Sequence, residues 1–483
     1  MGLRSAEQYV ASLKDGRRVF FRGKRVADVT THPVIGVAVK HAATDYRMAD
    51  DPAYRDLAVV TEGEGAPYSR YYQIPRTTDD LLRRSSLIEQ ATAEGGTLVV
   101  LIKEIGTDAL SGLLRVSSLI DAKRKTTYHE RVKAFYRHCR DNDLAVAVAQ
   151  TDVKGDRSLG PSAQADPDLY VRIAERRPDG IVVRGAKAHT SVSTNANELI
   201  VLPTRAMGPG DEAYAVSFAV PLATPGLTLL ASAYDSTAPQ GSPIEYPISA
   251  HHKMMETTTV FEDVFVPWER VFLAGEPEFA GPVALSFVEH HRFTAISYKL
   301  PLVDALVGSA MLMADLNGIA KAGHARDKVT QLISYAETLR GLTHYAALRG
   351  TTREAGVMAP DPMYVNMAKY HFAHGYHEAV RHVQDLAGGA LVTGPGAEDL
   401  TSAETAPYYE KYYVGRSGVT GRERLRALSL VRNLVASEFA AYQEVLAVHA
   451  EGSLEAEKQM VLRSYNPKPA LEYVRRLLGA PGA

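Results

Sequence analysis

The 483-residue chain changes its pattern twice along its length, and this change constrains the fold more than any other feature of the sequence. Between 144 and 273, short β-branched runs alternate with turn residues, as at 180–185, 198–202, 214–220 and 257–266. Runs of this kind are typical of β-strands. Before and after that stretch, apolar residues recur three and four positions apart, as on the buried face of a helix. The sequence therefore predicts an α+β protein with a β layer between two helical layers.

The same spacing locates the flanking helices. In the first third of the chain it predicts helices over 5–13, 79–93 and 127–141. After 287 it predicts a bundle, in which a helix over about 325–348 carries an apolar stripe able to pack against another helix or subunit. The stripe consists of Val329, Leu332, Ala336, Leu339, Leu342 and Ala346. We expect three domains, 1–143, 144–280 and 281–483, joined in one body.

Charge and hydropathy argue against two classes of partner. Lys and Arg total 54 and Asp and Glu total 56, so the formal net charge of −2 creates no field that attracts nucleic acid. No uninterrupted apolar run reaches the ~18 to 20 residues of a membrane span. The N-terminus carries no apolar secretory segment. We therefore expect a cytoplasmic protein that binds neither nucleic acid nor a membrane.

The chain contains one cysteine, Cys139, and this limits its metal chemistry. One thiol excludes intrachain disulfides, cysteine-rich zinc modules and any iron–sulfur cluster held by several thiolates of this chain. His371, His374 and His377 share a helix-like stretch, but no thiolate or nearby carboxylate completes a ligand set there. We therefore expect no metal site.

Two polar segments of the β layer have the groups to meet a planar, charged ligand. The first leaves an apolar strand and turns at Gly155; its polar residues are Gln150, Thr151, Lys154, Asp156, Arg157 and Ser158. Such a turn suits a flavin edge or a pyrophosphate, and it equally suits a solvated β turn. The second contains His189, Thr190 and Ser191, which either hydrogen-bond a heterocycle or belong to a plain hairpin.

A third polar segment opens the C-terminal bundle. It runs Glu289-His290-His291-Arg292-Phe293 and continues to Tyr298. Its imidazoles, guanidinium and phenol can supply a proton donor or acceptor and an anion anchor. We expect His291 to act as the general base or acid, Arg292 as the anion anchor and Tyr298 as an orienting donor. The alternative is that His291 only hydrogen-bonds inside the bundle.

Further motifs extend over nearly the whole chain. In chain order they are Asp15-Gly16-Arg17, Asp28-Val29, His32-Pro33, Asp80-Leu81 with Arg84, the turn 151–158, Gly185-Ala186-Lys187, Val266-Pro267-Trp268-Glu269-Arg270, Leu386-Ala387-Gly388-Gly389 and Lys411-Tyr412. Together they resemble the 4-hydroxyphenylacetate 3-monooxygenase family, which also contains the 4-hydroxybutyryl-CoA dehydratases.

This resemblance implies an acyl-CoA-dehydrogenase-like fold: a helical N-terminal domain, an antiparallel β-barrel-like middle domain and a C-terminal four-helix bundle that assembles homotetramers. It also implies an FAD site. By the resemblance, FAD would be contacted by Gln150, Thr151, Lys154, Gly155, Asp156, Arg157 and Ser158, and His189, Thr190 and Ser191 would lie near its isoalloxazine ring. His449, Glu451, Gly452 and Ser453 would close the site from the C-terminal domain.

The chain departs from both branches that the resemblance names. The dehydratase branch holds a [4Fe–4S] cluster with three cysteines and one histidine; the histidine matches His291, but one cysteine position is Tyr298 and the other two have no counterpart. The phenol-hydroxylating branch carries an Arg-Ser-Pro-Asp-Tyr loop and a histidine before the flavin turn. Here the loop region is 106–111 and the histidine position is Val148.

We therefore expect the oxygenase component of a two-component monooxygenase. Reduced FAD from a separate flavin reductase would react with O2 and hydroxylate a small aromatic or heteroaromatic substrate. The absence of a nicotinamide-binding pattern is consistent with an outside reductase. The first alternative is a cluster-free FAD-dependent lyase or isomerase related to 4-hydroxybutyryl-CoA dehydratase. The second is a flavin-binding or scaffold protein without catalysis.

Overall fold

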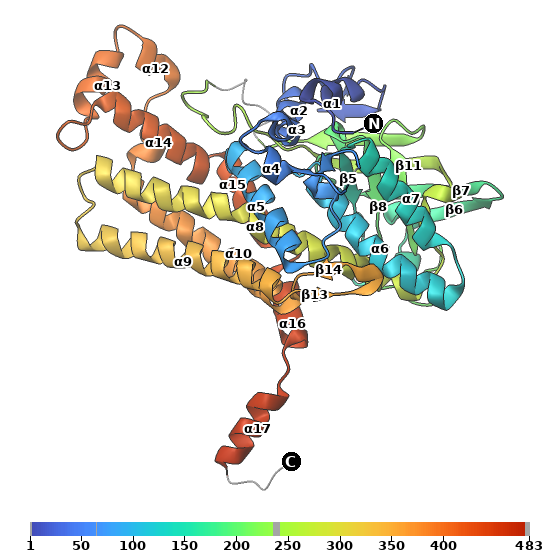
Figure 1. Cartoon of the computed structure of the whole chain (residues 1–483). Coiled ribbons are helices and arrows are strands. Elements are labelled where there is room, and N and C mark those ends of the chain that lie inside the picture. The colour runs from blue at the N-terminus through green and yellow to red at the C-terminus, as the bar shows by residue number, and fades with distance from the viewer. Residues whose placement is uncertain (1, 64, 235–241, 479–483) are drawn as a thin grey trace.

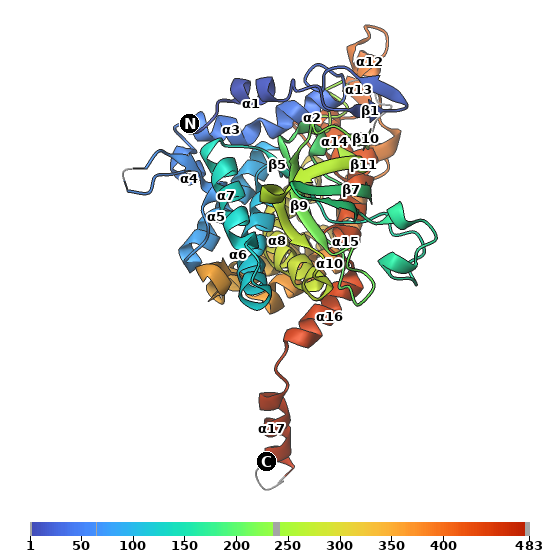
Figure 2. The same ribbon diagram turned by 90° about the vertical axis from the view of Figure 1, so that its right-hand side faces the viewer.

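The structure is a computed structural model that describes residues 2–63, 65–234 and 242–478. Helices flank a β layer on both sides (Figures 1 and 2). The N-terminal helices and the C-terminal helices meet along the long helix α8. The N-terminal helices are α1 (Ala6–Ser12), α2 (Ile35–Ala42), α3 (Thr44–Asp50), α4 (Arg55–Ala58), α5 (Thr78–Glu94), α6 (Glu104–Arg124) and α7 (Tyr128–Asp141). The predicted helices 5–13, 79–93 and 127–141 thus exist, with ends shifted by one residue.

Two sheets form the β layer. The larger has the strand order β2 (Lys24–Val26), β1 (Val19–Phe21), β10 (Leu227–Ser232), β11 (Glu256–Pro267), β7 (Gly180–Lys187) and β6 (Arg172–Arg177). The smaller has the order β12 (Val271–Ala274), β9 (Val216–Pro221), β8 (Glu198–Val201) and β5 (Val146–Ala149). Short two-stranded pairs are β3 (Val59–Val60) with β4 (Tyr68–Ser69), and β13 (Thr351–Thr352) with β14 (Met358–Ala359).

The β layer is not a closed barrel and not wholly antiparallel, which refines the expectation. β1 comes from the N-terminal region and pairs in parallel with β10, while β5 pairs in parallel with β8. The long strand β11 joins β10 to β7, and its register shifts between Phe261 and Val264, where Asp263 has φ +54°. Such a bulge bends the strand and increases its local twist.

The C-terminal helices form the second helical layer. They are α8 (Pro277–Leu316), α9 (Gly323–Leu348), α10 (Pro362–Ala387), α11 (Ala390–Thr393), α12 (Ala397–Thr401), α13 (Ala406–Tyr412), α14 (Gly421–Val435), α15 (Glu438–His449), α16 (Leu454–Ser464) and α17 (Lys468–Leu477). By length and composition α8 could cross a membrane, but 56% of its most apolar window is buried inside the protein. It packs against α5, α6, α9 and α10, which is the environment of a core helix.

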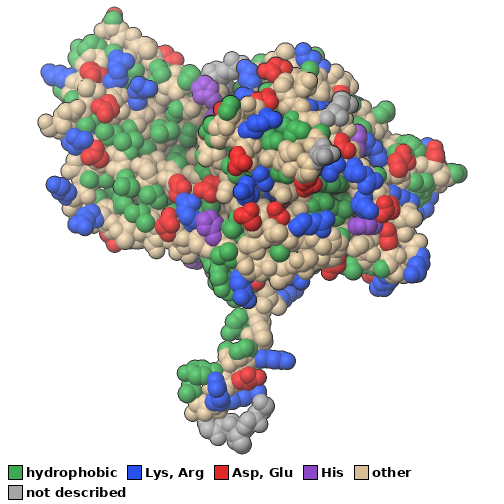
Figure 3. All heavy atoms as spheres, in the orientation of Figure 1, with side chains coloured by type: hydrophobic (Ala, Val, Ile, Leu, Met, Phe, Trp, Pro, Cys, Tyr) green, Lys and Arg blue, Asp and Glu red, His purple; other side chains and the backbone are tan. Residues whose placement is uncertain are grey.

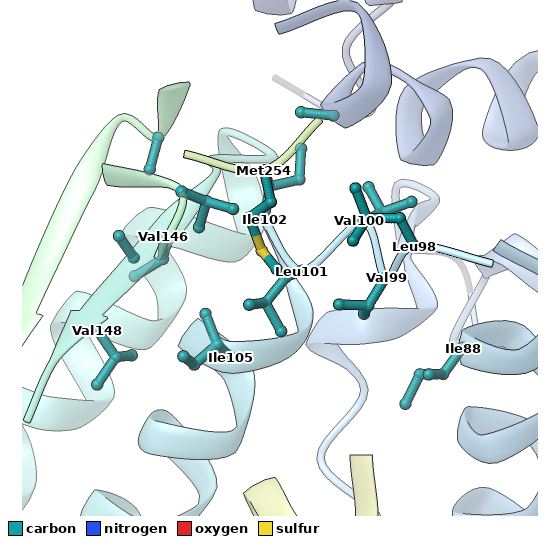
Figure 4. Packing of buried hydrophobic residues seen from close by; sticks show 14 of the residues in the cluster. Ile88, Leu98, Val99, Val100, Leu101, Ile102, Ile105, Val146, Val148 and Met254 are labelled. Carbon is teal, nitrogen blue, oxygen red and sulfur yellow. The ribbon is translucent and has the colours of Figure 1, made fainter. Parts of the chain in front are cut away.

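A segment without regular structure carries part of the core between α5 and α6. Figure 4 shows the apolar side chains of 98–102 among Ile105, Val146, Val148 and Met254. His41 reinforces this packing, because its Nε2 lies 3.0 Å from the carbonyl oxygen of Val99. The backbone just after α5 is therefore held in place on its buried side.

Close packing of α6 on β5 depends on Gly106. A Cβ there would lie 2.4 Å from the Cβ of Val146 and 2.7 Å from its carbonyl oxygen, whereas a Cβ at Gly308 on α8 would meet no atom within 4 Å. We predict that Gly106→Ala lowers the free energy of unfolding by about 1 to 3 kcal/mol through overpacking. Gly308→Ala should raise it by about 0.5 to 1 kcal/mol through helix propensity. Urea denaturation of both variants tests this, and equal effects would contradict the close contact.

Candidate functional site

The base of the expected flavin turn is fixed by a buried ion pair. The ammonium group of Lys187, on β7, lies 2.9 Å from Oδ2 of Asp152 and donates to the carbonyl oxygens of Gln150 and Leu202 at 2.8 Å each. The other carboxylate oxygen of Asp152 accepts a bond from the backbone N–H of Val171. Because both charges are satisfied inside the chain, this pair shapes the turn and leaves ligand contacts to its neighbours.

The tip of the turn combines an unusual backbone with open side chains. Lys154 and Gly155 both have positive φ, +79° and +52°. Asp156 accepts bonds from the backbone N–H and the hydroxyl of Ser158, at 2.9 and 2.7 Å. Asp156, Arg157 and Ser158 are exposed, whereas Gln150, Thr151 and Lys154 are half-buried. The turn thus offers one partly buried ammonium group and one exposed guanidinium on the same loop.

The segment after β7 contains a buried hydroxyl that lacks a protein partner. His189 is exposed with φ +55°, and Thr190 is fully buried. The Oγ1 atom of Thr190 has no hydrogen-bond partner among the described residues. An unpaired buried hydroxyl costs about 1 to 3 kcal/mol unless a ligand meets it. This hydroxyl and the nearby turn are groups that fit the polar edge and the phosphates of FAD.

Ser191 belongs to a buried network around Glu256, at the start of β11. The hydroxyl of Ser191 donates to both oxygens of the Glu256 carboxylate, at 3.0 and 2.9 Å. The phenol of Tyr442, on α15, donates to the same carboxylate at 2.9 Å. Burial raises the pKa of Glu256 to about 7, against the opposing effect of these two hydrogen bonds. This network ties the expected isoalloxazine segment to the C-terminal bundle.

One face of α8 links the flavin turn to His291. The side-chain amide of Gln150 donates to the carbonyl oxygen of Ala284 at 3.4 Å. Ala284, Phe287 and His291 follow one another at spacings of three and four, so they share a face of α8. The rings of Phe287 and His291 stack with centroids 4.9 Å apart. His291 therefore lies two turns along α8 from the point that the flavin turn touches.

A carboxylate on α6 orients His291. Nδ1 of His291 lies 3.1 Å from Oδ2 of Asp108, and Oδ1 of Asp108 accepts a bond from Arg84 at 2.8 Å. Burial acts to raise the pKa of Asp108, but the charges of Arg84 and His291 outweigh it and lower that pKa. The ionised carboxylate accepts a hydrogen bond from the Nδ1–H group of His291, which leaves the lone pair on Nε2. His290 instead faces Arg115, 3.5 Å away, and burial lowers the pKa of His290 to about 3.

Tyr298 belongs to a buried charge cluster centred on Glu451. The Glu451 carboxylate accepts a hydrogen bond from the Tyr298 phenol and lies 3.1 Å from the ammonium group of Lys299 and 3.9 Å from that of Lys369. Burial opposes ionisation of Glu451, but Lys299 and Lys369 lower its pKa to about 2. Burial lowers the pKa of Lys299 to about 8. Burial, then Glu451, raise the pKa of Tyr298 well above its usual value.

Arg292 and the other expected C-terminal residues surround the same cluster. The guanidinium group of Arg292 donates to the carbonyl oxygen of Glu451 at 2.8 Å and to the side chain of Asn366. Gly452 has φ +124°, and a Cβ there would lie 2.3 Å from Nη2 of Arg292. Ser453 caps α16 by accepting from the N–H of Ala456, and His449 is exposed. The roles assigned to these residues stay predictions.

Sequence reasoning missed three buried polar residues that hold the site together. Asp108 lies in the 106–111 region, which the structure places in the first turns of α6. Glu256 and Lys369 come from β11 and α10. The signal for Asp108 was an acid among small residues in an apolar helix pattern; no local signal marks the other two, because their partners are far apart in the sequence.

The site residues do not fit the dehydratase-type cluster. The single thiol of the chain, Cys139, is buried on α7. His291 is engaged by Asp108, and Tyr298 by Glu451. Among the residues that the structure describes, no group of three or more His, Cys, Asp or Glu side chains is arranged to hold a metal ion.

The N-terminal helical layer, the β layer and the helical bundle thus contribute the buried carboxylates of Asp108, Glu256 and Glu451. The family models for the N-terminal and C-terminal parts of 4-hydroxyphenylacetate 3-hydroxylase match residues 5–273 and 280–479. The chain therefore belongs to the 4-hydroxyphenylacetate 3-hydroxylase family, and the expected family and acyl-CoA-dehydrogenase-like fold are confirmed.

Both named branches are represented among the similar proteins. The chain is 34% identical to 4-hydroxybutyryl-CoA dehydratase/vinylacetyl-CoA-Delta-isomerase of Clostridium aminobutyricum over 99% of both chains. Its structure resembles the oxygen-tolerant 4-hydroxybutyryl-CoA dehydratase from N. maritimus with a TM-score of 0.93 and 29% identity, covering 100% of this chain and 96% of that one. It also resembles the oxygenase component of 4-hydroxyphenylacetate 3-monooxygenase complexed with FAD, with a TM-score of 0.90 and 28% identity, covering 98% of each.

The raised pKa of Glu256 predicts how the stability of the protein depends on pH. The Glu256 carboxyl group loses its proton near pH 4.5 in the unfolded chain and near pH 7 in the folded chain, so the parent loses stability as pH rises through that window. Glu256→Gln removes this dependence. Its free energy of unfolding relative to the parent should therefore rise by about 1 to 3 kcal/mol between pH 4.5 and 7. Denaturation without FAD measures it; the exposed control Glu455→Gln should show no such change, and a flat difference for Glu256→Gln would contradict the shift.

Proposed function

We propose that this chain is the oxygenase component of a two-component monooxygenase that hydroxylates a small aromatic or heteroaromatic substrate. A separate reductase supplies reduced FAD, and O2 is the co-substrate. Bound reduced FAD would supply the two electrons that activate O2. The proposal rests on the likeness to an FAD-complexed oxygenase component over nearly the whole chain, and it includes a cytoplasmic location.

The observation that carries the proposal is the identity of the residues at the positions where the dehydratase branch has its cluster ligands. The thiol ligands of a cluster are absent, and the residues there are a histidine paired with Asp108 and a tyrosine bonded to Glu451. The groups that suit FAD remain: Thr190 with its unpaired hydroxyl, and the turn around Lys154. Flavin chemistry without a cluster is therefore the function that these residues support best.

Within this proposal His291 handles the proton of the substrate. Its Nε2 is basic because Nδ1 is held by the ionised Asp108. Phe287 covers one face of the imidazole and keeps water from it. The Tyr298 phenol keeps its proton at neutral pH, since its pKa is raised by burial and by the Glu451 carboxylate.

A rapid-mixing experiment tests the proposal. The purified protein is loaded anaerobically with reduced FAD, mixed with O2, and followed by absorbance and by H2O2 release. We expect oxidised FAD to return at least tenfold more slowly than from free reduced FAD, with a hydroxylated product when a suitable phenol is present. Re-oxidation as fast as that of free flavin, with one H2O2 per FAD for every phenol tried, would contradict it.

A cluster-free lyase or isomerase is the second candidate, and one observation favours it. Tyr298, Lys299 and Glu451 form a buried set of proton-holding groups beside the His291 region, and the similar Clostridium protein is named as a dehydratase and isomerase. Vinylacetyl-CoA incubated anaerobically with the FAD-loaded protein distinguishes the two. Conversion of vinylacetyl-CoA under these conditions would favour the isomerase and count against the monooxygenase.

His291 should matter for turnover more than for cofactor binding. His291→Ala should bind FAD with a Kd within twofold of the parent and turn over ~10²- to 10⁴-fold more slowly, because the proton acceptor is lost. His290→Ala is the matched control, since it removes a neighbouring buried imidazole that faces Arg115, and its rate should stay within a few-fold. The measurement is product per FAD-loaded folded subunit. A parent-like rate for His291→Ala would leave the imidazole a structural role.

The proposal also includes assembly into a homotetramer. α17 stands away from the body, and Figure 3 shows apolar side chains gathered on this projecting arm. Leu471, Val474 and Leu477 are 51%, 52% and 69% exposed. A ten-residue helix is marginal alone in water, so a covering surface on another copy would stabilise it.

The arm predicts the outcome of a sedimentation experiment. Replacing Leu471, Val474 and Leu477 with Ser together should reduce the assembled mass, because the apolar face no longer gains from burial. Replacing Glu472 and Arg475 with Ser is the control and should leave the mass unchanged. A parent-like mass for the triple variant would remove α17 from the assembly.

A further inference from the structure

A surface cavity between α5 and α8 shares one lining residue with a small internal cavity beside Tyr298. The cavity has a volume of about 500 Å³ and is lined by Ala93 and Gln90 of α5, by Pro301 and Asp304 of α8, and by Thr97 in the loop after α5. A separate internal cavity of about 10 Å³, room for about one water molecule, is lined by Val99, Tyr298 and Lys299, and again by Thr97. Thr97 therefore lines both the outer and the inner cavity.

Two further properties mark Thr97. Its φ is +74°, a left-handed conformation that β-branched residues rarely adopt, and its Oγ1 atom is buried without a hydrogen-bond partner among the described residues. The apolar segment 98–102 that follows is anchored in the core, so the strained backbone cannot relax on that side (Figure 4). Strain and an unpaired hydroxyl at one residue are typical of a position kept for ligand contact.

The charges at the outer cavity select against anions. Glu89 and Asp304 line it, and both pair with the guanidinium group of Arg340, at 3.0 and 2.7 Å. Glu337 lies 3.4 Å from the same guanidinium group. Three carboxylates around one cation leave a negative rim. A carboxylate ligand or a polyphosphate is repelled by such a rim, and a neutral or cationic ligand is not.

We propose that the cavity between α5 and α8 is the substrate entrance, and that Thr97 is the positioning residue at its inner end. This deepens the proposed function, on which it rests, by naming the substrate class: a neutral or cationic small molecule with a hydroxyl, carbonyl or amine that hydrogen-bonds Thr97. The side chain of Thr97 both donates and accepts, so any of these groups satisfies it. Free aromatic carboxylates and CoA thioesters lie outside this class.

Three probes with the same phenol ring test the charge selection. Equilibrium dialysis of the protein loaded with oxidised FAD would compare tyramine, p-cresol and 4-hydroxyphenylacetate, which are cationic, neutral and anionic near pH 7. We expect tyramine and p-cresol to bind at least tenfold more tightly than 4-hydroxyphenylacetate. Equal or tighter binding of the anion, or no binding of any probe, would overturn the proposal.

A cysteine in the cavity tests the route. Ala93→Cys places one accessible thiol there, because the native Cys139 is buried, and Ala134→Cys on the exposed side of α7 is the matched control. After complete modification with a bulky thiosulfonate, p-cresol binding should fall at least tenfold in Ala93→Cys and stay within twofold in Ala134→Cys, with recovery on reduction. Unchanged p-cresol binding by fully modified Ala93→Cys would overturn the route.

Thr97→Val tests the hydroxyl while keeping the branched shape. The variant should bind p-cresol at least fivefold more weakly, with a melting temperature equal to or above that of the parent, because an unpaired buried hydroxyl is removed. Parent-like binding would overturn the role of Thr97. These binding measurements need no oxygen chemistry. Failure of the rapid-mixing experiment alone would therefore contradict the proposed function, whereas failure of the binding measurements alone would contradict the entrance and the role of Thr97.

Discussion

The carboxylate of Glu451 is the buried charge on which the arrangement of the site depends. It lies between two ammonium groups, those of Lys299 on α8 and Lys369 on α10, and it accepts a hydrogen bond from the Tyr298 phenol. An isolated buried carboxylate would cost several kcal/mol, and so would each buried ammonium group alone. Together they hold the segment after α15 against α8. The backbone of the same residue accepts a hydrogen bond from Arg292, so Glu451 positions four groups of the bundle.

This constraint makes α8 the axis of the site. Along it lie the contact with the flavin turn at Ala284, the stacked pair of Phe287 and His291, and then Tyr298. Asp108 of α6 bonds His291 on this helix, and the charge of Glu256 of β11 acts on Tyr298 of the same helix. Each of these two layers thus contributes one carboxylate, and the two differ in charge state, because Asp108 stays ionised beside Arg84 whereas Glu256 has a raised pKa.

Periodicity was sufficient to predict the layers, because helix and strand patterns report burial directly. The helix expected at 325–348 is Gly323–Leu348, and its Leu332, Ala336 and Leu339 are buried. These stripe residues pack against other parts of the same chain, whereas Ile333 and Tyr345 are exposed and face outward. Pairings between distant segments could not be predicted. The parallel contact of β1 with β10 and the approach of Asp108 to His291 join residues more than 180 positions apart, and neither leaves a local pattern.

A double-mutant cycle tests the central claim that Glu451 and Lys299 stabilise each other in the interior. The free energy of unfolding is measured for the parent, Glu451→Gln, Lys299→Met and the double variant. Each single change strands a charge, so the double variant should be less destabilised than the sum of the singles by about 1.5 kcal/mol or more. Additive effects, within about 0.3 kcal/mol, would contradict the claim and leave the site without its organising charge.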